Sequence, residues 1–354
     1  MTFQNTRRCY RRWNVMNDFF KAVRGFILEY LPKQRCFSEN TIKSYRTALN
    51  LFVEYLRTEK QLTIEQINFS IIDRKLVIEF LDWLESARNC NASSRNQRLM
   101  ALRSFFEFAG IADCTQVALQ LDIKDVPIKK APGRMVEFLT ESALEALLKQ
   151  PNPNKRTGLR DQFFMVLMYD TAARCGELLT MRVGNLHIST KHPSAYLYGK
   201  GDKPRSVPLL DKTAEHCKRY LQAFHPNPHP DDYLFYTVIH GMRHQMSADC
   251  VARFMKKYGE LAKKDCPTVP QHIHPHQLRH TRAIHYYRDG MPLFLIAEQL
   301  GHASVETTKV YAYADTEMKR AAMEKADHNR NLSPAATPIW QGNEEMILKL
   351  SGLR

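Results

Sequence analysis

Apolar residues recur at helical spacing through the first third of the chain. Over 16–31 they fall at i, i+3, i+4 and i+7, which predicts an amphipathic helix that Pro32 is expected to end. A second helix is predicted over 38–56, because it opens on a serine, a good N-cap. Further helices are predicted over 74–86 and 94–109. With short connections between them, these four helices predict one compact bundle.

The helical pattern weakens after this bundle. The string DVPIKKAPGR contains two prolines, a glycine and three bases, and it predicts an interdomain linker over 116–135. Beyond the linker helices resume, but the stretches 195–198 and 206–209 alternate in polarity across the polar turn GKGDKPR. This arrangement predicts a β-hairpin. The expected fold class is therefore mainly α with a small β-hairpin or sheet. A helical domain comes first in the chain, and an α+β domain follows it.

The length of 354 residues favours two or three domains. The pattern divides the chain into a basic N-terminal extension (1–15), a helical domain (16–115), the linker (116–135), a mixed domain (136–320) and a tail (321–354). The tail is polar and contains prolines, and it ends in a short apolar stretch over 344–350 that is too short to be a stable helix alone in water.

Composition narrows the class of protein. Hydrophobic residues make up 44% of the chain and charged residues 25%, which excludes a mostly disordered or collagen-like chain. The longest apolar stretches, such as 163–169, are far too short to span a bilayer. The net charge of +14 favours a polyanionic partner, nucleic acid before an anionic membrane surface, although a basic but otherwise ordinary enzyme stays open.

The cysteines and the N-terminus indicate a cytoplasmic protein. The eight cysteines are widely spaced and form no C-x-x-C pair, which argues against a zinc ribbon or a disulfide framework. No apolar segment follows the N-terminal arginines, so no secretory signal is expected. His272, His274 and His276 alternate, but no cysteine or carboxylate lies near them at ligand spacing, and no metal site is expected.

Four local patterns in the second half carry candidate chemistry, and each has a plain structural alternative. Arg174 precedes Glu177 by three residues, a spacing most often found in surface ion pairs of a helix. Lys200 lies between two glycines, where a lysine is usually solvated. The third pattern is the string HQLRH, and the fourth is LGHA, which contains His302. Tyr311 lies nine residues after His302, and a tyrosine at such a position is by itself most often a half-buried core residue.

Taken together, these patterns resemble the tyrosine recombinases, the integrase family of site-specific DNA recombinases. The family pattern is Arg, Lys, His-x-x-Arg, His and a nucleophilic Tyr. In this chain it is carried by Arg174, Lys200, His276, Arg279, His302 and Tyr311. The strings GKGDKPRSVPL, HPHQLRHTRA and LGHASVETTKVYAY are close to the family form, and the opening FSENTIKSYRTALNLFVEYL extends the resemblance over roughly 16–320.

The resemblance implies a two-domain DNA clamp, with a SAM-like core-binding domain over 16–115 and a catalytic domain over 136–320. It implies cleavage of a phosphodiester by a side-chain oxygen, which builds negative charge on the non-bridging phosphate oxygens. A guanidinium offers phosphate a planar fork of donors and stays charged. Arg174 and Arg279 are therefore expected to clamp the phosphate, and His302 to add a third donor.

The resemblance also implies the proton transfers. Tyr311 is the expected nucleophile, and its phenol, with an ordinary pKa of about 10, needs help to lose its proton. His276 is the candidate base, and Lys200 is the candidate acid for the leaving 5′ oxygen. Glu177 is expected to hold an active-site arginine or histidine in orientation. No cofactor is expected, because the phosphotyrosyl bond conserves the energy of the broken bond.

Candidate DNA contacts lie in both domains, and a solvated basic face is the alternative for all of them. The helix that opens at Ser38 brings hydroxyls and bases to its N-terminus, which suits a phosphate. Other bases lie on the fourth helix, in the linker and in the hairpin. The candidates are Thr41, Lys43, Ser44, Arg46, Arg95, Arg98, Arg103, Lys129, Lys130, Lys203 and Arg205.

The expected partners are double-stranded DNA with inverted-repeat core sites and other recombinase protomers, in a homo-tetramer or a hetero-tetramer with related recombinases; no membrane is expected. The tail is expected to dock in trans on a neighbouring protomer, with Ile347 and Leu350 as anchors, and packing in cis on its own catalytic domain is the alternative. The long tail favours integration, excision or transposition of a mobile element. A Xer-like resolvase, a type IB topoisomerase and a catalytically inactive DNA-binding protein are the alternatives.

Overall fold

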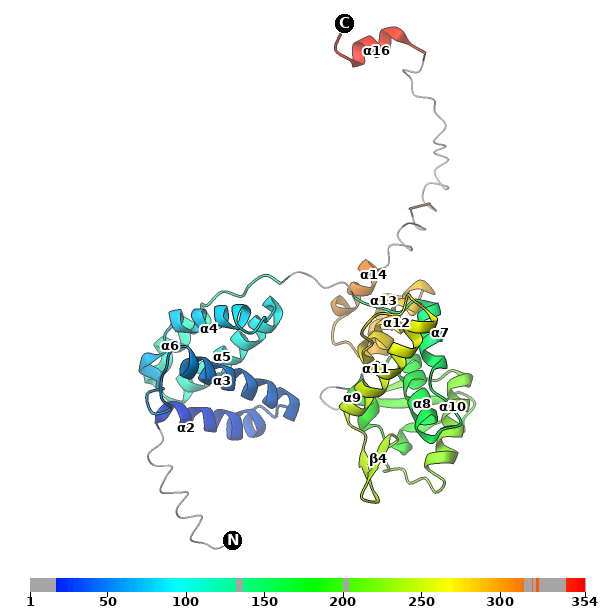
Figure 1. The fold of residues 1–354 in the computed structure, drawn as a ribbon, viewed down its shortest axis with the longest axis horizontal. Helices are drawn as coiled ribbons and strands as arrows, with labels where there is room; N and C mark the ends of the chain where they lie inside the picture. The colour runs from blue at the N-terminus through cyan, green and yellow to red at the C-terminus, as the bar shows by residue number, and fades with distance from the viewer. Residues whose placement is uncertain are drawn as a thin grey trace. The chain divides into compact units, whose positions relative to one another are not determined.

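The computed structural model describes residues 17–131, 136–199, 204–314, 320, 323–324 and 342–353. The chain separates into two compact units, one up to Gly133 and one from Arg134 onward. In Figure 1 the first unit is coloured from blue to cyan, and the second begins in green. The predicted fold class is confirmed, since helices dominate both units and the strands form two small antiparallel sheets in the second.

The first unit is entirely helical within its described residues. Its elements are α2 (Asp18–Gly25), the π-helical segment η1 (Phe26–Gln34), α3 (Glu39–Thr58), the 3₁₀ turn η2 (Phe69–Ile71), α4 (Arg74–Ser86), α5 (Ala92–Ala112), the 3₁₀ turn η3 (Cys114–Gln116) and α6 (Val117–Lys124). Side-chain caps start these helices, and the one at Ser38 was predicted. Ser38 accepts a hydrogen bond from Thr41 N, and Asp73 and Asn91 cap α4 and α5 in the same way.

Pro32 does not end the first helix, contrary to the prediction. The chain widens into π-helical turns at Phe26 and continues through Pro32 to Gln34. In an α-helix a proline ring clashes with the carbonyl four residues earlier and leaves it without a donor. The wider winding bonds residues five apart, as Arg35 N does to Tyr30 O, and so accommodates the proline.

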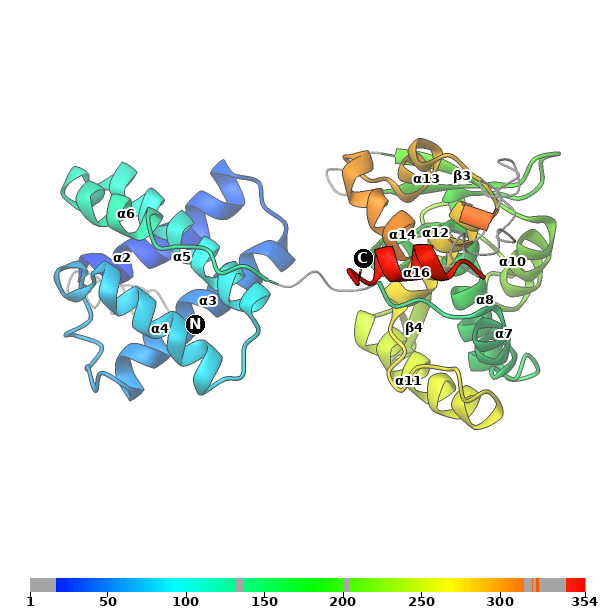
Figure 2. The same ribbon diagram turned by 90° about the horizontal axis from the view of Figure 1, so that it is seen from above.

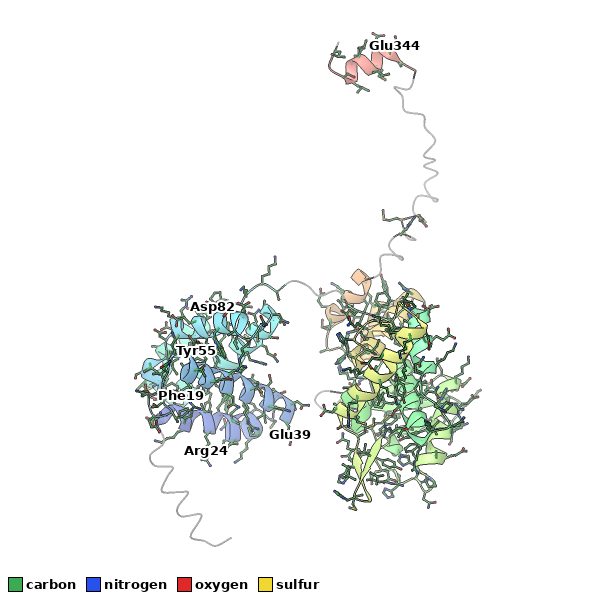
Figure 3. All side chains as sticks on the ribbon, viewed as in Figure 1. Phe19, Arg24, Glu39, Tyr55, Asp82 and Glu344 are labelled. Atoms are coloured by element: carbon green, nitrogen blue, oxygen red, sulfur yellow. The ribbon has the colours of Figure 1, made fainter. Side chains whose placement is uncertain are left out.

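An aromatic core holds the first unit together. Phe19 and Tyr55, which Figure 3 labels on α2 and α3, are buried in it. Phe19 packs edge-on against Phe105 of α5, with ring centroids 5.5 Å apart, and Phe26 does the same. Edge-to-face pairs of this kind stabilise the core beyond the contribution of the apolar area that they bury.

The segment after α5 belongs to the first unit and not to the linker. The linker was predicted from residue 116, yet α6 forms over Val117–Lys124 and packs along α5. Ile123 and Val126 are fully buried in the aromatic core. The predicted linker is therefore about ten residues too long, because two buried side chains fix a segment whose sequence shows little periodicity.

Replacing Ile123 by alanine should loosen the first unit. Loss of a fully buried isoleucine costs about 2–5 kcal/mol. Hydrogen exchange of the amides of α5 and α6 in the full chain, followed by mass spectrometry, measures the opening free energy. The matched control is Leu121→Ala on the same helix, which removes a 52% exposed side chain and should change that energy by less than about 0.5 kcal/mol. Equal effects of the two substitutions would contradict the packing of α6.

The second unit carries helices around two small sheets. Its elements are α7 (Glu141–Lys149), α8 (Arg156–Thr171), α9 (Cys175–Thr180), η4 (Val183–Asn185), β1 (Leu186–His187), β2 (Ser194–Tyr198), β3 (Pro204–Pro208), α10 (Asp211–Phe224), β4 (Tyr236–Ile239), β5 (Met242–Gln245), α11 (Ala248–Asp265), α12 (Pro275–Arg288), α13 (Leu293–Leu300), η5 (Val305–Thr308) and α14 (Lys309–Ala314). The tail contributes α16 (Glu344–Leu350).

The predicted hairpin is present. β2 and β3 pair antiparallel with Ser194 opposite Pro208 and Tyr198 opposite Pro204, and β1 adds a third strand. A second hairpin, β4–β5, was not predicted. Helix α12 is the organising element, since it contacts α8, α11, α13 and α14. Figure 2 shows α13 and α14 near it. In the described part of the chain, no helix combines the length and apolarity needed to cross a bilayer.

Candidate active site

A left-handed turn presents Arg174. Helix α8 ends at Ala172, whose φ of 49° reverses the chain and leaves Arg174 as the N-cap of α9. The Arg174 backbone N–H donates to Glu177 Oε2 (2.8 Å), and Nη1 donates to Glu177 Oε1 (2.8 Å). Nη2 donates to Gly301 O (3.1 Å), at the end of α13. The Arg174 side chain is about one third exposed, so its guanidinium is fixed and still accessible to a ligand.

Glu177 is the buried anion of the site. Its carboxylate accepts two bonds from Arg205, from Nη1 at 3.1 Å and from Nη2 at 2.7 Å, in addition to the two from Arg174. Burial by itself would raise the pKa of Glu177, but the hydrogen bonds from Arg205 and Arg174 outweigh it and lower the pKa. The carboxylate is therefore ionised at neutral pH. It is not a surface ion pair, the alternative considered for it, because its side chain is only 5% exposed.

Arg205 was expected to contact DNA, but its side chain is largely buried. Its side chain is only 12% exposed, and its guanidinium is occupied by Glu177 and by Gln299 O, which accepts from Nε at 3.0 Å. Arg205 therefore ties the β2–β3 hairpin to α9 and to the end of α13. Hairpin residues Lys200 and Lys203 lie outside the described residues.

Arg279 is buried beneath the same turn. It is 3% exposed, and it donates from Nη1 to Ala172 O (2.7 Å) and from Nη2 to Leu300 O (2.6 Å). Burial, with the nearby Arg174 cation, lowers the pKa of Arg279 to about 10, so the group stays charged at neutral pH. The two arginines thus bond the neighbouring carbonyls of Leu300 and Gly301, and the next residue is His302.

His302 follows Gly301, which ends α13 with a φ of 61°. A side chain at position 301 would be strained by that φ, and a Cβ there would lie 2.9 Å from Arg205 Nη1. His302 Nδ1 lies 2.9 Å from the hydroxyl of the buried Thr308. When Thr308 donates to Nδ1, the ring carries its hydrogen on Nε2, where it can serve as a donor. Burial and the nearby Arg279 lower the pKa of His302 to about 4.

Tyr311 is packed into a small apolar cluster. It is 2% exposed and contacts a cluster that includes Ala172, Ile284 and Leu300. Its Oη lies 2.9 Å from His280 Nδ1. Burial raises the pKa of Tyr311, against the opposing effect of Arg279 and Arg174. The side chain of Tyr313 is outside the described residues.

His280 was missed at the sequence level, although it is the last residue of the string HQLRH. The signal was present, because i+4 spacing on a helix puts it on the same face as His276. The two rings lie 6.2 Å apart, centroid to centroid. His276 itself is exposed to solvent. Its ring is nevertheless partly desolvated by neighbouring groups, and this desolvation, with the nearby Arg279, lowers its pKa.

The other candidate DNA contacts are placed in two groups. The side chains of Arg95 and Arg103 bond to backbone carbonyls of the first unit. Arg95 is 5% exposed and donates to Pro127 O (3.3 Å), and Arg103 donates to Val126 O. They anchor the segment after α6. The others lie on or near the surface of the first unit: Thr41, Lys43, Ser44 and Arg46 at the start of α3, half-buried Arg98, Lys129 paired with Glu85 (2.9 Å), and Lys130.

Within the described ranges, no group of three or more histidine, cysteine or acidic side chains is arranged to hold a metal ion. The seven described cysteines are free thiols.

Comparisons with known proteins show the family of the chain. Residues 137–318 match the phage integrase family, and residues 26–111 match the SAM-like N-terminal domain of phage integrases. The chain is 31% identical over 306 residues to a putative integrase/recombinase, y4rC, of Sinorhizobium fredii, covering 86% of this chain and 90% of that protein. The chain belongs to the phage integrase family, the tyrosine recombinases.

Other family members align over most of the chain. The tyrosine recombinase XerD of Staphylococcus aureus is 30% identical over 289 residues, 81% of this chain and 92% of that protein. The XerH recombinase in a post-cleavage complex with difH has the same fold, with a TM-score of 0.61 at 21% identity over 80% of this chain and 79% of that one. The Tn1549 transposon integrase in complex with a circular intermediate DNA gives a TM-score of 0.63 at 15% identity, over 88% and 99%.

Arg205→Ala should destabilise this tyrosine recombinase strongly. It leaves the buried Glu177 carboxylate short of two hydrogen bonds, and breaking a buried ion pair costs about 3–5 kcal/mol. Arg205→Lys should recover only part of this, because one ammonium cannot replace the planar fork. Thermal unfolding of the catalytic unit measures the loss. Arg219→Ala, an exposed arginine of α10, is the control, and an equally small effect of both alanine variants would contradict the role of Arg205.

Proposed function

We propose that this tyrosine recombinase cuts and rejoins duplex DNA at a specific site through a 3′-phosphotyrosyl intermediate and a Holliday junction, in the integration, excision or transposition of a mobile element. One observation carries the proposal. Arg174 and Arg279, from two different helices, bond the adjacent carbonyls of Gly301 and Leu300, directly before His302. Three donors of the family pattern are thereby held together at one turn.

This turn has the properties of a phosphate clamp. Arg174 and Arg279 are both fixed by carbonyl and carboxylate contacts that use only part of their donors, since a guanidinium has five N–H groups. Donors that are positioned before the substrate arrives stabilise the charge of a transition state without reorganising. The two arginines and His302 then bind the non-bridging oxygens of the scissile phosphate, and Glu177 keeps Arg174 in place.

The chemical step is a transesterification. Tyr311 Oη attacks the phosphorus, the bond to the 5′ oxygen breaks, and Lys200 gives that oxygen its proton. Attack of the free 5′ hydroxyl of another strand reverses the step. The Tyr311 hydroxyl is buried in the DNA-free chain, so its cluster has to shift for the oxygen to reach a phosphate.

The charge and the family support DNA binding by both units. The net charge of +14 supports long-range attraction to DNA, and Lys43, Arg46 and Lys130 are exposed in the first unit. Inverted-repeat core sites and a tetramer of identical or related protomers are part of the proposal. Relatives named as integrase and as XerD both align over most of the chain, and the 34 residues after position 320 favour the mobile-element role.

Tyr311→Phe should abolish covalent attachment to DNA and leave binding unchanged, because only the hydroxyl is lost. A nicked suicide substrate traps the adduct of the unmodified chain, and peptide mapping identifies the tyrosine. Tyr313→Phe is the matched control and should still form the adduct. Mapping of the adduct to Tyr313 would overturn the assignment, and efficient relaxation of a plasmid without a special site would favour a topoisomerase.

The tail is proposed to dock in trans. Helix α16 is capped by Asn343, and its apolar side chains are exposed: Met346 by 38%, Ile347 by 45% and Leu350 by 69%. So short a helix needs an apolar groove to be stable, and a neighbouring protomer can supply one.

Removing residues 336–354 should weaken cooperative assembly on a full site and spare the binding of one protomer to a half-site. Ile347→Asp should reproduce the loss, because it places a charge in the docked face. Lys349→Ala, on the same helix, is the control. Gel-shift titrations on half and full sites measure the cooperativity. Unchanged cooperativity after the deletion would exclude docking in trans.

A further inference from the structure

Helix α12 carries a second histidine, His280, that touches the reacting atom. Its Nδ1 lies 2.9 Å from the hydroxyl oxygen of Tyr311, and the two rings are 5.7 Å apart, centroid to centroid. His276, which the family resemblance marks as the candidate base, lies one helical turn earlier and is exposed. In the described part of the chain it is therefore His280 that is in place to receive the phenol proton.

The surroundings favour one direction for this hydrogen bond. Tyr311 is 2% exposed among apolar neighbours that include Ile284 and Leu300, and a buried hydroxyl needs a partner for its proton. The phenol satisfies this need when it donates to Nδ1 and the imidazole carries its hydrogen on Nε2.

The electrostatics keep His280 ready to accept a proton. Burial, with the nearby His276 and Arg279, lowers the pKa of His280 to about 4, so the ring is neutral at neutral pH. A DNA phosphate bound by Arg279 brings a negative charge to the same place and offsets the field of that cation. The proton affinity of His280 then rises when substrate is bound, which is when a base is needed.

We propose that His280 keeps its hydrogen bond to Tyr311 as the tyrosine shifts toward the DNA, and that it accepts the hydroxyl proton as the phenol attacks, a step that rests on the proposed function. The Oη–H bond breaks and its proton passes to Nδ1, while an Oη lone pair forms the bond to phosphorus. The bond from phosphorus to the 5′ oxygen breaks, and that oxygen takes a proton from Lys200. Religation reverses each transfer.

His280→Asn tests this step. An asparagine amide oxygen takes the place of Nδ1 as an acceptor but cannot hold a proton at neutral pH. Single-turnover formation of the covalent adduct on a nicked suicide substrate should slow by roughly 10²–10⁴-fold, the usual contribution of a general base. Gel-shift affinity and thermal unfolding should stay near those of the unmodified chain, which shows that the variant is folded.

His285→Asn is the matched control. His285 lies on the same helix, and its Nδ1 is 2.7 Å from the hydroxyl of Tyr169, so the same kind of contact is altered away from Tyr311. Its adduct formation should stay within about threefold of that of the unmodified chain. An equally small loss in His280→Asn would overturn the proposal.

A more acidic nucleophile separates proton transfer from positioning. Placing a fluorinated tyrosine that ionises near neutral pH at position 311 removes the need for a base. It should restore most of the rate of His280→Asn and little of the rate of His276→Asn. No rescue of His280→Asn, or rescue of His276→Asn alone, would overturn the proposal. If the unmodified chain forms no adduct at all, the proposed function fails, and this outcome is distinct from the others.

Discussion

The candidate site depends on one buried carboxylate. Glu177 accepts four hydrogen bonds, two from Arg174 and two from Arg205, and both arginines reach from there to the carbonyls at the end of α13. A buried anion is stable only while its partners stay in place, because an uncompensated charge inside the protein costs several kcal/mol. The carboxylate therefore joins α9, the β2–β3 hairpin and the turn before His302 into one unit.

Backbone carbonyls complete this arrangement. Arg279 is buried against Ala172 O and Leu300 O, and Arg174 bonds Gly301 O. Carbonyls that accept from arginine orient the guanidinium without cancelling its charge, so the cations keep their attraction for a phosphate. Two left-handed residues, Ala172 and Gly301, expose these carbonyls by ending their helices abruptly.

Packing holds Tyr311, the proposed nucleophile, apart from solvent. Tyr311 belongs to a cluster of its own with Ala172, Ile284 and Leu300, beside the main core of the second unit. The residues that orient Arg279 thus also pack with the tyrosine, since Ala172 and Leu300 supply both carbonyls and apolar surface. The packing of Tyr311 and the placement of Arg279 therefore depend on the same two residues.

Local patterns in the sequence predicted the helices over 74–86 and after Ser38, the β2–β3 hairpin and the family, because periodicity, caps and motifs are read within a few residues. The sequence did not predict α6, the second hairpin or the π-helical passage through Pro32, where tertiary packing overrides weak local preferences.

The limits of the sequence are clearest among the candidate site residues. The order of the motif indicated that Arg174, Arg279, His302 and Tyr311 belong together. Nothing in the sequence distinguished Arg205 from other bases in a polar hairpin, or marked His280 as more than a neighbour of the motif. Their partners lie 28 and 31 residues away along the chain. Only the tertiary structure decides which distant carboxylate or hydroxyl an arginine or a histidine contacts, because such contacts depend on how whole helices pack. Every residue has a backbone carbonyl, so the sequence cannot show which carbonyl accepts a hydrogen bond from an arginine.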